Sequence, residues 1–181
     1  MPENQWLSML EFQQTQASET QYLWLAERGS MTRQLMQAGL GRLKVAVLSS
    51  AHQMAEKEER LFLNLQQRSW PYIREVIMHV DNEAWMYGRT VIPTAALNGC
   101  GGQLRLLGEK PLGQLLFHNK TNARLFIEVA KISKHHYLYP TFMDHLKGQH
   151  LWARRSLFQY QNFPLLVQEV FLPNCPLQVP Q

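Results

Sequence analysis

Charged residues interrupt the apolar faces of three predicted strands, and their types could do chemistry. In the segment YIREVIMHV, strand alternation places Arg74 on a face that is otherwise apolar except for a tyrosine hydroxyl. In FPLLVQEVFL, the same alternation places Glu169 among leucine, valine and phenylalanine. In LWARRSLFQY, either Arg154 or Arg155 must point inward, whichever face is buried. These charges are therefore expected in the interior.

Two interpretations account for such charges, because an unpaired buried charge is expensive and needs a reason. In the first, the charges are structural: Arg74 pairs with Glu169, for example, or some of them lie on a solvated edge. In the second, they line a water-poor cavity with arginine at one end and a carboxylate at the other. That cavity would suit a small ring with a carboxylate and a hydroxyl, since Arg binds carboxylates bidentately and Glu accepts from a hydroxyl.

The elements that would position these residues predict an α+β fold: a single antiparallel β-sheet with helices packed on it. Strands are expected as hairpins, with DNE and QN as the turns, and hairpins favour an antiparallel sheet. The predicted strands are 42–50, 72–80, 84–92, 151–160 and 163–172. Two helices should precede the first strand, the second one capped by Ser30.

The remaining segments are less regular. A helix starting at Thr121 or Asn122 is expected, because apolar residues recur at intervals of three and four: Leu125, Phe126, Val129 and Ile132. QLRLLGEKPLGQLLF suggests a short strand and a short helical piece, and the stretch after Ala51 a short helix or a long loop. Residues 134–150 are interpreted as an inserted loop.

Composition sets the remaining limits. With 181 residues and 45% apolar content, the chain fits one domain spanning 1–181. Cys100 and Cys175 form no disulfide or metal motif, which favours a reducing, cytoplasmic setting, and we expect neither an export signal nor a membrane span. The net charge of +4 permits an anionic partner, but the basic residues are scattered and no nucleic-acid motif occurs, so a small anion is the better explanation.

Two other motifs do not match the functional sites that they suggest. Four histidines, with Asp144 among them, match no zinc template, so no metal is expected: His135, His136, His145 and His150. The segment NGCGG lacks the lysine and serine or threonine that follow a phosphate-binding loop, and a turn is the simpler interpretation.

The sequence resembles the chorismate pyruvate-lyases of ubiquinone biosynthesis. The matching segments are GSMTRQL, WPYIREVIMHVDNEAWMYGRTVIP, LGEKPLGQLLF, LWARRSLF and PLLVQEVFLPNCPL, in the family's order. Ser133–His150 is longer than expected for the family, and 51–68 shows little resemblance. The resemblance implies an internal ligand cavity covered by flaps, no metal or organic cofactor, and elimination of pyruvate from chorismate to give 4-hydroxybenzoate.

The resemblance also assigns roles to matched residues. Arg74 would bind the ring carboxylate, and Glu169 would contact the ring hydroxyl as an anchor or as a base, which the sequence leaves open. Met31 and Leu112 match positions that close over the ligand. The enolpyruvyl carboxylate needs its own cation, for which three arginines are available: Arg89, Arg154 and Arg155.

Substrate and products would be the partners of a protein expected to act as a monomer. The alternative is a non-catalytic module of the same fold that senses a small aromatic acid. Against it, no DNA-binding segment is recognisable in the chain. Formation of 4-hydroxybenzoate from chorismate would separate the two.

Overall fold

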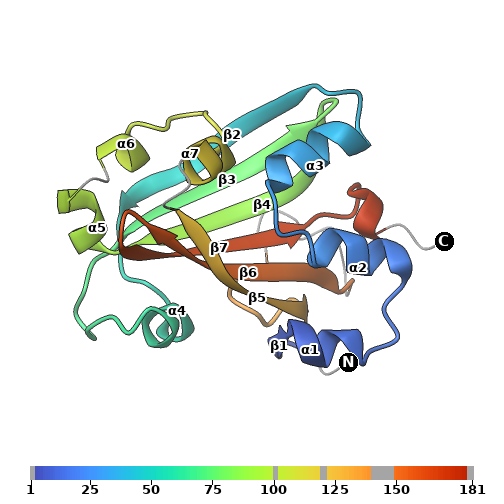
Figure 1. The fold of residues 1–181 in the computed structure, drawn as a ribbon, viewed down its shortest axis with the longest axis horizontal. Helices are drawn as coiled ribbons and strands as arrows, with labels where there is room; N and C mark the ends of the chain where they lie inside the picture. The colour runs from blue at the N-terminus through green and yellow to red at the C-terminus, as the bar shows by residue number, and fades with distance from the viewer. Residues whose placement is uncertain (1–2, 100–101, 119–121, 140–148, 179–181) are drawn as a thin grey trace.

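A computed structural model describes residues 3–99, 102–118, 122–139 and 149–178, and its centre is one antiparallel sheet. The seven strands lie in the order β1-β5-β6-β7-β4-β3-β2 (Figure 1). Every neighbouring pair is antiparallel, which confirms the predicted fold class. The strands are β1 Leu7–Ser8, β2 Leu43–His52, β3 Tyr72–Val80, β4 Glu83–Ile92, β5 Ala123–Ile132, β6 Leu151–Tyr160 and β7 Phe163–Phe171.

Short helices lie against this sheet (Figure 1). They are α1 Met9–Gln13, α2 Glu19–Leu25, α3 Met31–Ala38, α4 Lys57–Phe62, α5 Thr94–Gly99, α6 Gly102–Arg105 and α7 Leu112–His118, followed by a 3-10 turn at Pro176–Gln178. Both helices expected before the first long strand are present as α2 and α3, and β1 and α1 precede them as additions. Within the described ranges, no helix has both the length and the apolar composition needed to cross a membrane.

Two tight turns fix the register of the central strands. Asp81 and Asn82, between β3 and β4, have φ angles of 52° and 74°, and Gln161 and Asn162, between β6 and β7, have 48° and 72°. Two successive residues with positive φ form the turn that matches the twist of a hairpin, and Asn and Asp tolerate this conformation. The two predicted hairpins are therefore confirmed, and each turn sets which residues of its two strands lie opposite one another.

The helix predicted near Thr121 is wrong, because residues 123–132 form β5. Thr121 itself lies outside the described residues. Of the apolar residues thought to share one helical face, Leu125 is 49% exposed while Val129 is fully buried. β5 hydrogen-bonds to β6 along its length and to β1 at one end, so pairing distant in sequence overrides the local three-and-four spacing.

Other irregular segments differ in detail from the prediction. Residues 102–105 are helical rather than extended, so the strand expected there is wrong. The stretch after Ala51 holds a short helix, α4, which was one of the two expected possibilities. Most of the predicted insertion, residues 140–148, lies outside the described residues, as do Cys100 and Gly101 of the glycine-rich segment.

The end of α3 is fastened to the turn between β3 and β4. The Leu40 backbone N–H donates to Asp81 Oδ2 at 2.6 Å, and Arg42 pairs with the other oxygen at 3.3 Å. Gly39 allows this close approach, since a Cβ there would overlap Cγ1 of Val80 and lie 2.8 Å from Asp81 Oδ2. α3 is thereby held at a fixed place above the sheet.

Gly39→Ala should lower the free energy of unfolding by about 1–3 kcal/mol, because the added methyl forces α3 away from the turn. Gly102→Ala is the matched control, since a Cβ at that position meets no atom within 4 Å. Urea unfolding of both variants measures the difference. Equal stability of the two would contradict the proposed close contact.

Candidate active site

A small cavity lies on one face of the sheet, beneath α3 and α7. Its floor includes Arg74 of β3, Gly88 of β4 and Glu169 of β7, and the starts of the two helices cover it. The cavity volume open to a water-sized sphere is about 50 Å³, so only a small molecule can bind there. The lining is mainly apolar, so charged groups within it are only weakly screened by water.

Strand register brings Arg74 and Glu169 to the same cavity. Arg74 pairs across the sheet with Thr90, and Glu169 pairs with Gly88, two residues away on the same strand. β4 alone separates β3 from β7, so two spacings of about 4.8 Å divide the two backbones. Arg74 is 4% exposed and Glu169 6%, which excludes the solvated-edge interpretation for both.

Arg74 is a buried cation without an acidic partner in the part of the chain that the structure describes. Its Nη2 donates to the backbone carbonyls of Gly108 at 2.8 Å and Lys110 at 3.1 Å, in the loop before α7. Burial lowers the pKa of the guanidinium, and the neighbouring Tyr72 opposes the shift only in part. The pairing of Arg74 with Glu169 considered from the sequence is not present, which leaves the Arg74 charge available to an anion in the cavity.

Glu169 is held by Arg154 instead. Nε of Arg154 lies 2.7 Å and Nη2 2.5 Å from the same oxygen, Oε2, and the Arg154 side chain is fully buried. Because both contacts use Oε2, Oε1 is the oxygen left to face a ligand. Arg154 also donates from Nη1 to the Glu27 carbonyl at 2.8 Å, so its orientation is fixed from two sides.

Met31 and Leu112 are the first residues of the two helices that cover the cavity, and both line it. Ser30 caps α3 by accepting from the Arg33 backbone N–H at 3.4 Å, as predicted. The helix starts touch, since a Cβ on Gly113 would lie 2.9 Å from Ser30 Oγ. The structure shows this cover in one position, so its opening as flaps stays a prediction.

Arg124 of β5 also lines the cavity, and the sequence analysis missed it because this segment was interpreted as a helix. Its Nη1 donates to the Glu27 carbonyl at 2.7 Å. Burial and then the charge of Arg154 lower the pKa of Arg124 to about 10. Read as a strand, ARLFIEVAKI would have drawn attention to it as a charge beside apolar residues.

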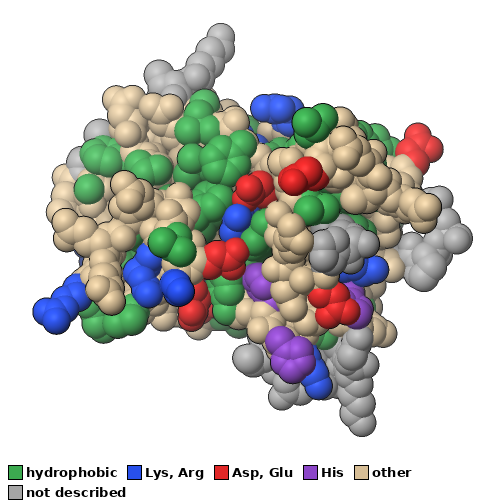
Figure 2. All heavy atoms as spheres, turned by 90° about the horizontal axis from the view of Figure 1, so that it is seen from below, with side chains coloured by type: hydrophobic (Ala, Val, Ile, Leu, Met, Phe, Trp, Pro, Cys, Tyr) green, Lys and Arg blue, Asp and Glu red, His purple; other side chains and the backbone are tan. Residues whose placement is uncertain are grey.

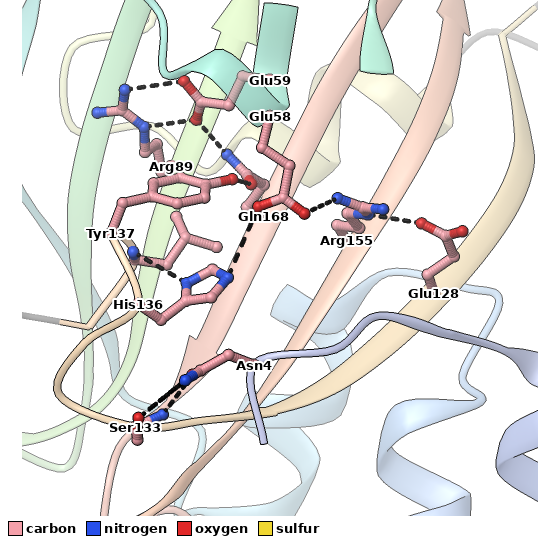
Figure 3. Close-up of polar contacts among 11 residues, drawn as sticks. Asn4, Glu58, Glu59, Arg89, Glu128, Ser133, His136, Tyr137, Arg155 and Gln168 are labelled. Atoms are coloured by element: carbon pink, nitrogen blue, oxygen red, sulfur yellow. Dashed lines mark hydrogen bonds and ion pairs between the residues drawn. The ribbon is translucent and has the colours of Figure 1, made fainter. Parts of the chain in front are cut away.

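Arg89 and Arg155 lie on the opposite face of the sheet, where each has its own acidic partners. Arg89 binds both oxygens of the fully buried Glu59 from α4, at 2.7 and 3.0 Å (Figure 3). Burial alone would lower the pKa of Arg89, but hydrogen bonds and charge from Glu59 outweigh it and raise the pKa. Arg155 pairs with Glu58 at 2.9 Å and Glu128 at 2.5 Å. Neither arginine lines the cavity, so the sequence-based suggestion that one of them serves the ligand is wrong.

Hydrogen bonds extend this polar network behind the site. Gln168 donates to Glu59 at 2.5 Å and accepts from the hydroxyl of Tyr137 at 2.5 Å (Figure 3). Figure 2, which views the molecule from the side of α4, shows acidic, basic and histidine side chains gathered near the centre and lower part of this face. The network joins α4 and the segment after β5 to the back of the sheet.

His136 belongs to this network as a neutral group. Burial and the neighbouring Arg155 lower its pKa to about 4. Its Nδ1 accepts from the Leu138 backbone N–H at 3.2 Å, while Nε2 is 3.7 Å from Glu58, too far for a hydrogen bond (Figure 3). The nearby carboxylate therefore does not offset the lowering of the His136 pKa by burial and Arg155.

Among the described residues, no group of three or more His, Cys, Asp or Glu side chains is arranged to hold a metal ion. Asp144 and His145 of the histidine-bearing segment lie outside those residues. His150 pairs with Glu3 at 2.7 Å.

Replacing Glu59 should destabilise the protein strongly. Glu59→Ala removes the carboxylate that binds the buried Arg89 through two hydrogen bonds and accepts from Gln168, and among the described residues it leaves Arg89 only a single contact with Glu75 at 3.1 Å. We expect a loss of about 3–5 kcal/mol in the free energy of unfolding. The adjacent Glu58→Ala is the matched control, because Glu58 is 40% exposed and Arg155 keeps Glu128, so the loss should stay below about 1 kcal/mol. Similar losses in urea unfolding would contradict the role given to Glu59.

Stability should fall as the pH is lowered from 6.5 to about 4, in part because of His136. In this window the unfolded chain takes up a proton that the folded His136 does not, so acid favours unfolding by up to about 1.4 kcal/mol per pH unit. His136→Gln should show a shallower decline over the same window. Parallel pH profiles for variant and wild type would contradict the neutral, buried state.

A family model described as chorismate lyase matches residues 2–178. The chorismate pyruvate-lyase of Hamiltonella defensa is 38% identical over 159 residues, covering 85% of this chain and 78% of the relative. The Escherichia coli chorismate pyruvate-lyase is 34% identical over 167 residues, covering 92% and 91%. The probable chorismate pyruvate-lyase of Coxiella burnetii is 32% identical over 168 residues, covering 93% and 91%.

Solved structures show the same fold at low sequence identity. The ligand-binding domain of a putative GntR-family transcriptional regulator from Bordetella bronchiseptica has a TM-score of 0.54 at 13% identity, covering 75% of this chain and 85% of that one. PhnF from Mycobacterium smegmatis has a TM-score of 0.53 at 14% identity, covering 80% and 64%. The likeness extends to architecture alone, whereas the match over residues 2–178 shows that the chain belongs to the chorismate lyase family.

Proposed function

We propose that this protein is a chorismate pyruvate-lyase, which eliminates pyruvate from chorismate and releases 4-hydroxybenzoate for ubiquinone biosynthesis. The observation that carries the proposal is the pair of buried charges, Arg74 and Glu169, in one small cavity of a chorismate lyase family member. Action in the cytoplasm belongs to the same proposal, supported by the low cysteine content of the sequence, and so does action as a monomer.

Arg74 binds the ring carboxylate in this proposal. Its guanidinium is buried, borders the cavity and has backbone carbonyls rather than a carboxylate as partners. A carboxylate there would meet an already desolvated cation, which strengthens the interaction.

The starts of α3 and α7 supply further donors. Met31 and Leu112 open these helices, and the first N–H groups of a helix have no partner within it. They can donate to the carboxylate that Arg74 holds. Arg74 contacts the loop at Gly108 and Lys110, and this loop leads directly into α7. A ligand that binds Arg74 can therefore also affect the position of α7 over the cavity.

Glu169 accepts a hydrogen bond from the ring hydroxyl through Oε1, while Arg154 holds Oε2. Arg74 and Glu169 then grip the two ends of one ring, which fixes its orientation before reaction. Glu169 is also a candidate acceptor for the ring proton, since a base must lie close to the hydroxyl-bearing carbon.

The chemistry is an elimination whose driving force lies in the substrate. The ring carbon that bears the hydroxyl loses its proton, and the electrons of that C–H bond form the last double bond of an aromatic ring. The neighbouring C–O bond breaks, and its electron pair leaves on the oxygen of pyruvate enolate, which takes a proton on carbon. No electron acceptor is needed, so the protein must orient the ring, stabilise the leaving anion and move protons.

A ligand sensor is the alternative, because the ligand-binding domain of a putative GntR-family regulator has the same fold, although the family match favours the lyase. Such a sensor would use the same charges for binding without turnover. Incubation with chorismate, followed by absorbance of 4-hydroxybenzoate, separates the two: the proposal predicts product, and binding without product would favour the sensor.

Arg74→Ala should weaken 4-hydroxybenzoate binding by about 2–5 kcal/mol, because the ring carboxylate loses a desolvated charged partner. Calorimetry on wild type and variant measures the change. Arg68→Ala is the matched control, since Arg68 is exposed and does not line the cavity, and its affinity should be unchanged. Near-normal affinity of the Arg74 variant would contradict the assignment.

A further inference from the structure

The proposed substrate carries a second carboxylate, on its enolpyruvyl arm, and this inference rests on the proposed function. The arm is bonded to the ring carbon next to the one that bears the hydroxyl. With the hydroxyl at Glu169 and the ring carboxylate at Arg74, the arm must lie near the Glu169 end of the cavity. A cation at that end would bind the arm in the substrate and hold the charge that leaves with pyruvate.

Arg124 occupies this end of the cavity. Its Nη1 donates to the Glu27 carbonyl at 2.7 Å, and Nη1 of Arg154, the partner of Glu169, donates to the same carbonyl at 2.8 Å. One backbone oxygen thus links Arg124 to the arginine that holds Glu169. The charge of Glu169 also acts on Arg124, raising its pKa against the stronger effects of burial and Arg154, which agrees with this proximity.

Arg124 has unused binding capacity. Nε is buried and has no hydrogen-bond partner, and no acidic side chain of the described chain forms an ion pair with this arginine. The guanidinium lies over the ring of Phe158 at 4.7 Å from its centre and over that of Phe117 at 5.5 Å. The aromatic rings and the Glu27 carbonyl restrict its orientation, so little freedom is lost when an anion binds.

The other arginines considered for this carboxylate are occupied. Arg89 and Arg155 lie behind the sheet with glutamate partners. Arg154 is fully buried, binds Glu169, and is not among the residues that line the cavity. We propose that Arg124 binds the enolpyruvyl carboxylate of chorismate and thereby positions the C–O bond that breaks.

The test compares two ligands that differ in the arm. 4-Hydroxybenzoate lacks it, while 4-hydroxy-3-(carboxymethoxy)benzoate carries a stable carboxylate arm at the corresponding ring position. Calorimetry measures both affinities in wild type, Arg124→Met and Arg124→Lys, and chorismate turnover is followed in parallel. Arg28→Met is the matched control. Arg28 is exposed and does not line the cavity, but its charge acts on Arg124.

Arg124→Met should weaken binding of the arm-bearing ligand by about 10- to 100-fold, the effect of one lost charge-assisted contact, and change 4-hydroxybenzoate affinity by less than about 3-fold. kcat/KM for chorismate should fall by about the same factor as the affinity for the arm-bearing ligand. Arg124→Lys, which keeps the charge, should recover part of both losses, and Arg28→Met should change neither affinity.

Equal weakening of both ligands by Arg124→Met and Arg124→Lys would mean that Arg124 only supports the structure, and would overturn the inference. Unchanged affinity for the arm-bearing ligand would overturn it as well. Failure of the wild type to make 4-hydroxybenzoate would instead contradict the proposed function, while the two affinities would still report whether Arg124 binds a carboxylate.

Discussion

The structure depends on how one sheet distributes buried charge between its two faces. On the face toward α4, arginine is matched to carboxylate, with Arg89 on Glu59 and Arg155 on Glu58 and Glu128. On the cavity face, Glu169 pairs with Arg154, while Arg74 has only backbone carbonyls as partners among the described residues. An isolated cation in an apolar cavity is costly, and an anionic ligand removes that cost.

The paired face supports the unpaired one through chain adjacency. Gly88 of the cavity floor precedes Arg89, and Gln168, which binds Glu59, precedes Glu169. Because neighbouring residues on a strand point to opposite faces, the polar network holds the backbone from behind while side chains stay free on the other side. Binding residues on strands of such a sheet are placed more precisely than residues on loops.

The sequence predicted part of this arrangement. Arg74 and Glu169 were identifiable because alternation sets their side chains among apolar neighbours. Two tight turns predicted the neighbouring pairs β3 with β4 and β6 with β7. Arg124 was missed, because the spacing of apolar residues in β5 fits a helix as well as a strand, and the choice is made by β6 and β1. The two-residue turn at Gln161 and Asn162 sets Arg154 opposite Glu169 within one hairpin, so that pair follows from the local pattern. The pairing of β4 with β7 and the contact of Glu59 with Arg89 join segments far apart in sequence, so neither could be derived in this way.

A crystal structure with 4-hydroxybenzoate bound would show whether Arg74 and Glu169 hold the two ends of one ring. We expect one molecule in the cavity beneath α3 and α7, with its carboxylate on the Arg74 guanidinium and its hydroxyl on Oε1 of Glu169. A ligand bound outside this cavity, or one with its carboxylate turned toward Glu169, would contradict this expectation.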